Sequence, residues 1–89
     1  MSEKKSKQVE RLYEVITSIT EKKDCEAFLE DLCTYKEIES MAQRLDAARL
    51  LLGGETYESI IEKTGISSAT LSRVSKCVKF GKGYKKYLK

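Results

Sequence analysis

Apolar side chains recur every three or four residues along most of this chain, which is the spacing of one face of an α-helix. The first helix is predicted over residues 9–20, with an apolar stripe made of Val9, Leu12, Tyr13, Val15, Ile16 and Ile19. A second helix is predicted after Asp24, a suitable N-cap, with a stripe made of Phe28, Leu29, Leu32 and Cys33. Stripes this broad on two short, successive helices indicate that both bury against something larger than each other.

A capping-box pattern predicts the start of the longest helix. Thr34 and Glu37 have the spacing at which a Thr hydroxyl and a Glu carboxylate each satisfy a free backbone N–H of the first turn. The helix is predicted to run to about Leu52, where Gly53 and Gly54 end it. Its apolar face consists of Ile38, Met41, Ala42, Leu45, Ala48 and Leu52.

Residues 56–79, TYESIIEKTGISSATLSRVSKCVK, have the pattern of two short helices joined by a tight turn. Thr56 and Ser67 are suited to cap the two helices, and Gly65 can adopt the left-handed conformation that ends the first. A helix-turn-helix packs two such helices roughly at right angles, here around Ile60, Ile61, Ile66, Leu71 and Val74.

The opposite face of the second helix is small, hydrogen-bonding or cationic, as a helix in a DNA groove requires. Groups that would face base edges along residues 67–78 are Ser67, Ser68, Ala69, Ser72 and Arg73. Phosphates are expected to meet Lys76, Lys79 and Lys82, and the DNA backbone to meet Thr56 and Tyr57. An ordinary αα-hairpin whose serines only cap and solvate would give the same pattern.

The charge is divided unevenly along the chain. From Lys63 to the C-terminus there are eight Lys or Arg residues and no Asp or Glu, whereas residues 1–62 carry a net charge of −5. A cationic third of this kind is a footprint of phosphate binding. A solvated basic tail would not explain why the basic run starts inside the helix-turn-helix pattern.

Residues 80–89 are predicted to form a short basic C-terminal helix. Phe80, Gly81 and Gly83 interrupt the preceding helix, and the last turns are expected to be anchored by Tyr84, Tyr87 and Leu88. The chain has no proline, no strand-like alternation and no internal repeat, so the predicted fold is all-α with about six helices in one domain, residues 1–89. Because a chain of 89 residues buries little core alone, a partner subunit is expected.

Several classes of protein are not expected from the composition. No apolar run approaches the roughly 20 residues of a membrane span, and MSEKKSKQ lacks a signal peptide's apolar segment, which predicts a cytoplasmic protein. Cys25, Cys33 and Cys77 form no CxxC pair and the chain has no histidine, so no metal or cofactor is expected. Cys25 and Cys33 are expected to be buried as small hydrophobes. Without a histidine or a catalytic constellation, an enzyme is not expected.

The order of these elements resembles the Trp repressor family, and within it the YerC/YecD-like subgroup. The resemblance covers Cys33 to Lys79 and is strongest at QRLDAARLLLGGETYESI and GISSATLSRVSKCVK. It implies an intertwined all-α homodimer in which residues 9–52 are dimerisation helices and residues 56–79 the helix-turn-helix. It further implies a transcriptional regulator, expected to be a repressor, that binds double-stranded DNA.

The resemblance also implies a candidate ligand pocket between the longest helix and the recognition helix. Thr34, Arg44 and Arg73 match the residues that hold tryptophan in the family. Val74, however, stands where the tryptophan-responsive repressor has a glycine, and Cys77 stands where it has a serine. We expect Val74 to fill the space of the indole, so that tryptophan does not control this protein.

Two alternatives stay open at this point. The same hairpin could be a protein-interaction module that docks an acidic partner through the basic third of the chain. Alternatively, the protein could bind DNA and also bind a small ligand other than tryptophan.

Overall fold

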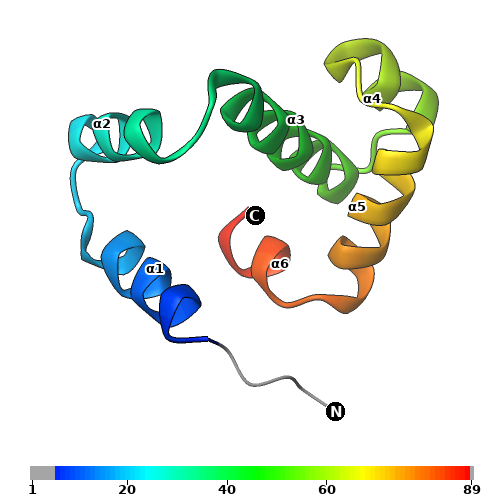
Figure 1. Cartoon of the computed structure of the whole chain (residues 1–89). Helices are drawn as coiled ribbons and strands as arrows, with labels where there is room; N and C mark the ends of the chain where they lie inside the picture. The colour runs from blue at the N-terminus through cyan, green and yellow to red at the C-terminus, as the bar shows by residue number, and fades with distance from the viewer. Residues whose placement is uncertain (1–5, 89) are drawn as a thin grey trace. The chain divides into compact units, whose positions relative to one another are not determined.

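The computed structural model describes residues 6–88, and within them it has six α-helices and no strand (Figure 1). The helices are α1 (Lys7–Ser18), α2 (Lys22–Leu32), α3 (Tyr35–Leu52), α4 (Tyr57–Thr64), α5 (Ser68–Phe80) and α6 (Gly83–Tyr87). The predicted all-α class is therefore confirmed. None of these helices combines the length and the apolarity that crossing a bilayer requires. The chain divides into two compact units, one ending at Tyr35 and the other beginning at Lys36.

In the first unit, α1 lies two residues earlier than predicted. Its N-cap is Ser6, whose hydroxyl accepts a hydrogen bond of 3.1 Å from the Val9 backbone N–H. The helix ends at Ser18, whose hydroxyl donates to the Val15 carbonyl at 2.6 Å, and Ile19 is extended. Serine hydroxyls bond locally to the backbone in this way and are therefore common at helix ends.

The prediction that Asp24 caps the second helix is wrong, because α2 begins at Lys22. Glu21 is the N-cap residue and makes no side-chain capping bond, so Asp24 lies in the first turn. A carboxylate is still stabilised there by the helix dipole. Cys33 is also off the predicted helical stripe, since α2 ends at Leu32 and Cys33 is extended. Cys33 and Cys25 are half-buried rather than buried as predicted.

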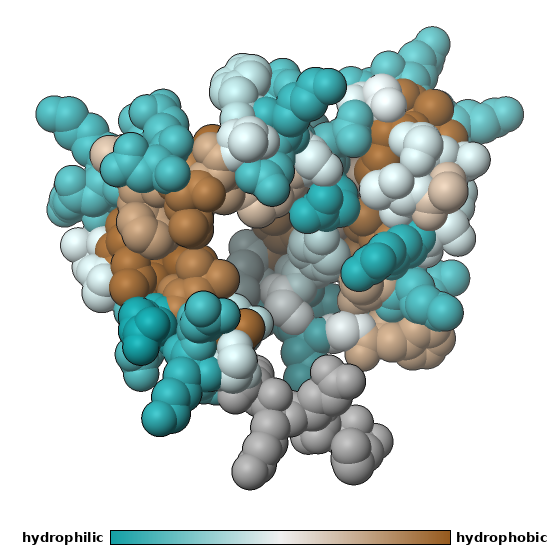
Figure 2. All heavy atoms as spheres, viewed as in Figure 1, coloured by the Kyte–Doolittle hydropathy of each residue, from teal (hydrophilic) through white to brown (hydrophobic). Residues whose placement is uncertain are grey.

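The first unit has no buried side chain of its own in α1 or α2. Ile16 is 43% exposed, Tyr13 50% and Leu32 52%, although all three belong to the predicted apolar stripes. Figure 2 shows apolar side chains gathered at the surface over these two helices. Apolar surface gathered in this way is typical of a surface that packs against another segment or another chain.

The second unit has a core that joins α3, α4 and α5. Its buried side chains are Ala47, Ala48, Ile60, Ile66, Leu71, Val74 and Val78. Each large aliphatic among them contributes roughly 1.5–3 kcal/mol by leaving water. The two alanines of α3 are fully buried, and their small side chains allow the other helices to pack closely against it.

The C-terminal helix packs differently from the prediction at one anchor. Tyr84 and Leu88 pack against the core as expected. Tyr87 is 77% exposed, so its assignment as an anchor is wrong. Tyr84 and Leu88 are four residues apart and define the packed face, whereas the Tyr87 ring lies 5.5 Å from the Lys86 ammonium at the surface.

Helix α5 extends to Phe80, one residue beyond the predicted end. A Cβ at Gly81 would lie 2.6 Å from the Cys77 carbonyl oxygen, so the glycine is required where the chain leaves the helix.

Candidate nucleic-acid interface

The start of α4 is braced by the residue that precedes its cap. Thr56 is the N-cap, and its hydroxyl accepts a hydrogen bond from the Ser59 N–H at 3.2 Å, as predicted. The Glu55 carboxylate accepts from the Ser59 hydroxyl at 2.6 Å and from Lys63 Nζ at 2.9 Å. The bond from Ser59, and then the bond from Lys63, lower the pKa of the Glu55 carboxyl below its ordinary value of 4.5. These hydrogen bonds therefore hold α4 to Glu55, the residue before its N-cap.

The turn between α4 and α5 is built around Gly65 and Thr64. Gly65 is left-handed, with φ of 75°, and its N–H donates to the Ile61 carbonyl at 2.8 Å, as predicted for this position. The Thr64 hydroxyl donates to the Ile60 carbonyl at 2.7 Å and accepts from the Ile66 N–H at 3.2 Å. The direction in which α5 leaves α4 is thus held on both sides of the glycine.

Helix α5 has one buried face and one exposed face. The Ser67 hydroxyl caps it by accepting from the Thr70 N–H at 3.2 Å, as predicted. Leu71, Val74 and Val78 enter the core. The opposite side is exposed and carries Ser68, Ala69, Ser72, Arg73, Lys76 and Lys79. The two-faced helix inferred from the sequence is therefore present.

All ten residues assigned to DNA contact have exposed side chains. They are Thr56, Tyr57, Ser67, Ser68, Ala69, Ser72, Arg73, Lys76, Lys79 and Lys82. Exposure is a requirement for contact with DNA, and each residue's role stays a prediction.

Two cations of the basic C-terminal third are already engaged. Lys63 is paired with Glu55 at 2.9 Å. Lys85 Nζ donates to the Lys79 carbonyl at 3.0 Å, near the end of α5. A cation at this position satisfies a carbonyl that lacks an intrahelical partner. The cations of the basic C-terminal third therefore fall into two groups: some make contacts within the fold, and the others lie at the surface.

The candidate ligand residues of the second unit are only partly brought together. Arg44 and Arg73 line one recess of about 490 Å³, together with Ala69 and Thr70. Val74 is 2% exposed and belongs to the core. Cys77 is exposed and lines a different recess, formed with Leu45, Gly83, Tyr84, Tyr87 and Leu88. Thr34 belongs to the first unit and directly precedes α3.

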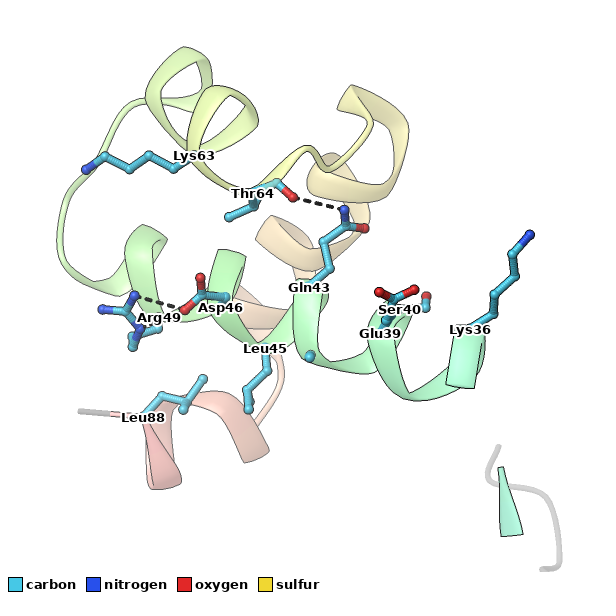
Figure 3. A pocket seen from close by; sticks show the side chains of 11 residues that line it. Lys36, Glu39, Ser40, Gln43, Leu45, Asp46, Arg49, Lys63, Thr64 and Leu88 are labelled. Atoms are coloured by element: carbon cyan, nitrogen blue, oxygen red, sulfur yellow. Dashed lines mark hydrogen bonds and ion pairs between the residues drawn. The ribbon is translucent and has the colours of Figure 1, made fainter. Parts of the chain in front are cut away.

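A larger recess, of about 820 Å³, involves residues that the sequence did not single out (Figure 3). It is lined by Lys36, Glu39, Ser40, Ala42, Gln43, Leu45, Asp46, Arg49, Lys63, Thr64 and Leu88. At its wall, the Gln43 side-chain amide points from α3 toward the turn and donates to the Thr64 carbonyl at 3.1 Å. No local pattern distinguishes Gln43 from an ordinary solvated helix residue, because its partner is 21 residues away.

Within residues 6–88 the structure brings together no group of three or more His, Cys, Asp or Glu side chains that could hold a metal ion. Glu39 and Asp46, which line the large recess, are accompanied there by Lys36, Arg49 and Lys63. Asp46 is paired with Arg49 at 2.9 Å. The charges of this recess are of mixed sign.

Known proteins are similar to this chain both in sequence and in the arrangement of their helices. The Bacillus subtilis protein YerC is 44% identical over 77 residues, which is 86% of this chain and 74% of YerC. The crystal structure of a TrpR-like protein from Eubacterium eligens matches with a TM-score of 0.87 and 41% identity, over 92% of this chain and 86% of that one. A crystal structure from Staphylococcus aureus, of a protein assigned as a Trp repressor, matches with a TM-score of 0.89 and 34% identity, over 94% of this chain and 85% of that one.

A family model extends this likeness over almost the whole chain. The model of the Trp repressor protein matches residues 7–89, and therefore includes α1 and α2 as well as the helix-turn-helix. The two structural likenesses cover a similar share of the chain at more than 30% identity. The chain therefore belongs to the Trp repressor protein family.

Proposed function

We propose that this protein is a sequence-specific DNA-binding transcriptional regulator, with α4 and α5 as a helix-turn-helix and α5 as the recognition helix. The observation that carries the proposal is the division of α5 into two faces. One face is fixed in the core by Leu71, Val74 and Val78. The other is exposed, free of acidic residues, and made mostly of small, hydroxyl-bearing and cationic side chains, with the exposed Phe80 at its C-terminal end. Such a face can enter a major groove and donate hydrogen bonds to base edges.

The contacts in this proposal are divided between reading and positioning. Arg73 and the exposed serines of α5 face base edges, where an arginine can pair bidentately with guanine. Lys76, Lys79 and Lys82 meet phosphates, and the α4 start at Thr56 and Tyr57 touches the sugar-phosphate backbone. Membership of the Trp repressor family supports DNA binding through the helix-turn-helix.

The proposed functional unit is a homodimer that acts as a repressor in the cytoplasm. The uncovered apolar surfaces of α1 and α2 support a second copy as their packing partner. Two-fold symmetry would then present two recognition helices one turn of B-DNA apart, about 34–36 Å. In this arrangement residues 9–52 supply the dimer contacts.

Tryptophan is not the effector in this proposal. The Val74 side chain fills a core position, with only 2% of its surface exposed, where a flat indole would need space. Arg44 and Arg73 line one recess and could attract a small anion, so a ligand other than tryptophan is compatible with the proposal.

The test is a fluorescence-anisotropy titration of a random duplex and of genomic fragments recovered by binding selection, at several salt concentrations. If Lys76, Lys79 and Lys82 of both subunits meet phosphates, the log–log slope of affinity against salt should be about −5, since each neutralised phosphate contributes about −0.9. A recovered fragment should bind at least about a thousandfold more tightly than the random duplex. Salt-independent or undetectable binding to both duplexes would favour the alternative, a module that docks an acidic protein.

A further inference from the structure

We propose that Gln43 is a positioning residue for sequence recognition, because it fixes the helix-turn-helix turn to α3 through its bond to the Thr64 carbonyl. This inference rests on the proposed function, since it explains how the recognition helix is held at a set orientation relative to α3, one of the helices that supply the proposed dimer contacts. Gln43 itself faces no DNA in the proposal. Its effect on binding passes through the turn.

The first step in the argument is that the Thr64 carbonyl needs a partner. Thr64 is the last residue of α4, and the last carbonyls of a helix have no intrahelical N–H to bind. The amide of Gln43 supplies that partner at 3.1 Å, in a part-buried contact (Figure 3). The side chains of Gln43 and Thr64 are both half-buried, so water is only partly available to replace the Gln43 amide as the partner of the Thr64 carbonyl.

The second step is that the bond acts at the point where the motif changes direction. A Cβ built at Gly65 would lie 3.8 Å from Gln43 Nε2, so the amide lies beside the left-handed residue of the turn. The hydroxyl of Thr64 is already used within the turn, by Ile60 and Ile66. Thr64 therefore connects three elements: its hydroxyl joins α4 to the residues before α5, and its carbonyl joins both to α3.

The third step separates this bond from the apolar packing. Ala47 and Ala48 of α3 contact the core through small, featureless side chains, and hydrophobic contact has no preferred direction. A hydrogen bond constrains both distance and angle. Packing thus keeps the motif on α3, while Gln43 sets the orientation at which it sits. In a dimer that orientation fixes the separation of the two recognition helices, on which half-site reading depends.

The test compares Gln43→Met, which keeps the length and removes the donor, with Gln43→Lys, which restores a donor. Gln8→Met makes the same chemical change at an exposed residue of α1 and is the matched control. The readout is the ratio of affinities for the selected and random duplexes, in which sequence-independent charge effects cancel. We expect Gln43→Met to lower this ratio about tenfold, as loss of a hydrogen bond in each subunit can do. Gln43→Lys should recover most of the ratio, and Gln8→Met should leave it unchanged.

A measurement without DNA separates this inference from the proposed function. Amide hydrogen exchange by NMR should become faster at Gly65 and Ile66 in Gln43→Met, and residual dipolar couplings should report a changed angle between α3 and α5. If the native protein shows no sequence preference, the proposed function fails, and the NMR measurements alone decide whether Gln43 positions the motif. Unchanged exchange and couplings in Gln43→Met would overturn the inference. Faster exchange in Gln43→Met together with an unchanged ratio of affinities for the selected and random duplexes would also overturn it, because Gln43 would then be a structural residue only.

Discussion

Arg73 is exposed on the acid-free face of α5, and Lys79 lies near the end of the same helix. If Arg73 pairs with a guanine, Arg73→Ala should weaken binding to the selected duplex by about 1–3 kcal/mol and relax its sequence preference. Lys79→Ala should instead weaken binding to all duplexes alike and make the salt slope shallower by about one unit for each phosphate that is no longer neutralised. Anisotropy titrations of both variants on both duplexes check this. Equal losses of affinity from the two substitutions on every duplex would remove Arg73 from base reading.

At the same scale, we expect Val74 to prevent a response to tryptophan. The Val74 side chain is 2% exposed, so it stabilises the fold by packing in the core. Val74→Gly should lower the free energy of unfolding by about 2–4 kcal/mol, because it reduces burial and because glycine has a low helix propensity. Calorimetry should show millimolar or weaker tryptophan binding to the native protein. Val74→Gly should bind tryptophan no more weakly than the native protein does. If the glycine variant does not fold, Val74→Ala takes its place in the measurement. Micromolar binding by the native protein, coupled to tighter DNA binding, would contradict the filled pocket.

At the scale of elements, the brace at the start of α4 should give the protein an acid-sensitive component of stability. The hydrogen bonds from Ser59 and Lys63 lower the pKa of Glu55 below its ordinary value of 4.5. The unfolded state therefore binds the proton more readily, so this stabilisation is present above about pH 4.5 and is lost as the pH falls through the lower pKa of the folded state. The difference in unfolding free energy between native protein and Glu55→Gln should shrink from neutral to acidic pH in urea titrations.

Glu62→Gln, at an exposed position of the same helix, is the control for this measurement. A stability difference between native protein and Glu55→Gln that stays constant across the pH range would show that the carboxylate charge is not what braces α4.

At the scale of the whole molecule, the uncovered apolar faces of α1 and α2 predict a dimer. Ile16 is 43% exposed and Phe28 half-buried, and both are expected to lie across the subunit interface. A stable interface of this kind removes at least about 1,200 Å² of surface from water. Sedimentation velocity at micromolar concentration should therefore show a dimer. Ile16→Glu should produce monomer with reduced helix content, whereas Glu14→Gln on the exposed side of α1 should not. A native protein that is monomeric and fully helical would contradict the prediction.

The sequence by itself determined the elements and the motif, because these depend on interactions within about four residues along the chain. Helical spacing identified all six helices that the structure describes within residues 6–88. The caps at Thr56 and Ser67 and the left-handed turn at Gly65 followed from local hydrogen bonds and φ preference. The start of α2 was missed, because Glu21, which makes no side-chain capping bond, is the N-cap residue and Asp24 lies in the first turn.

Only the tertiary structure decided which polar groups are occupied and which are free. The pairing of Gln43 with the Thr64 carbonyl depends on how α3 packs against the motif, 21 residues further along the chain. Lys63 and Lys85 have the same formal charge as Lys76, yet Glu55 and the Lys79 carbonyl hold them in place. Tyr87 has the spacing of an anchor but lies outside the packed face of α6. Such assignments depend on distances between segments remote in sequence, which hydrophobic periodicity does not encode.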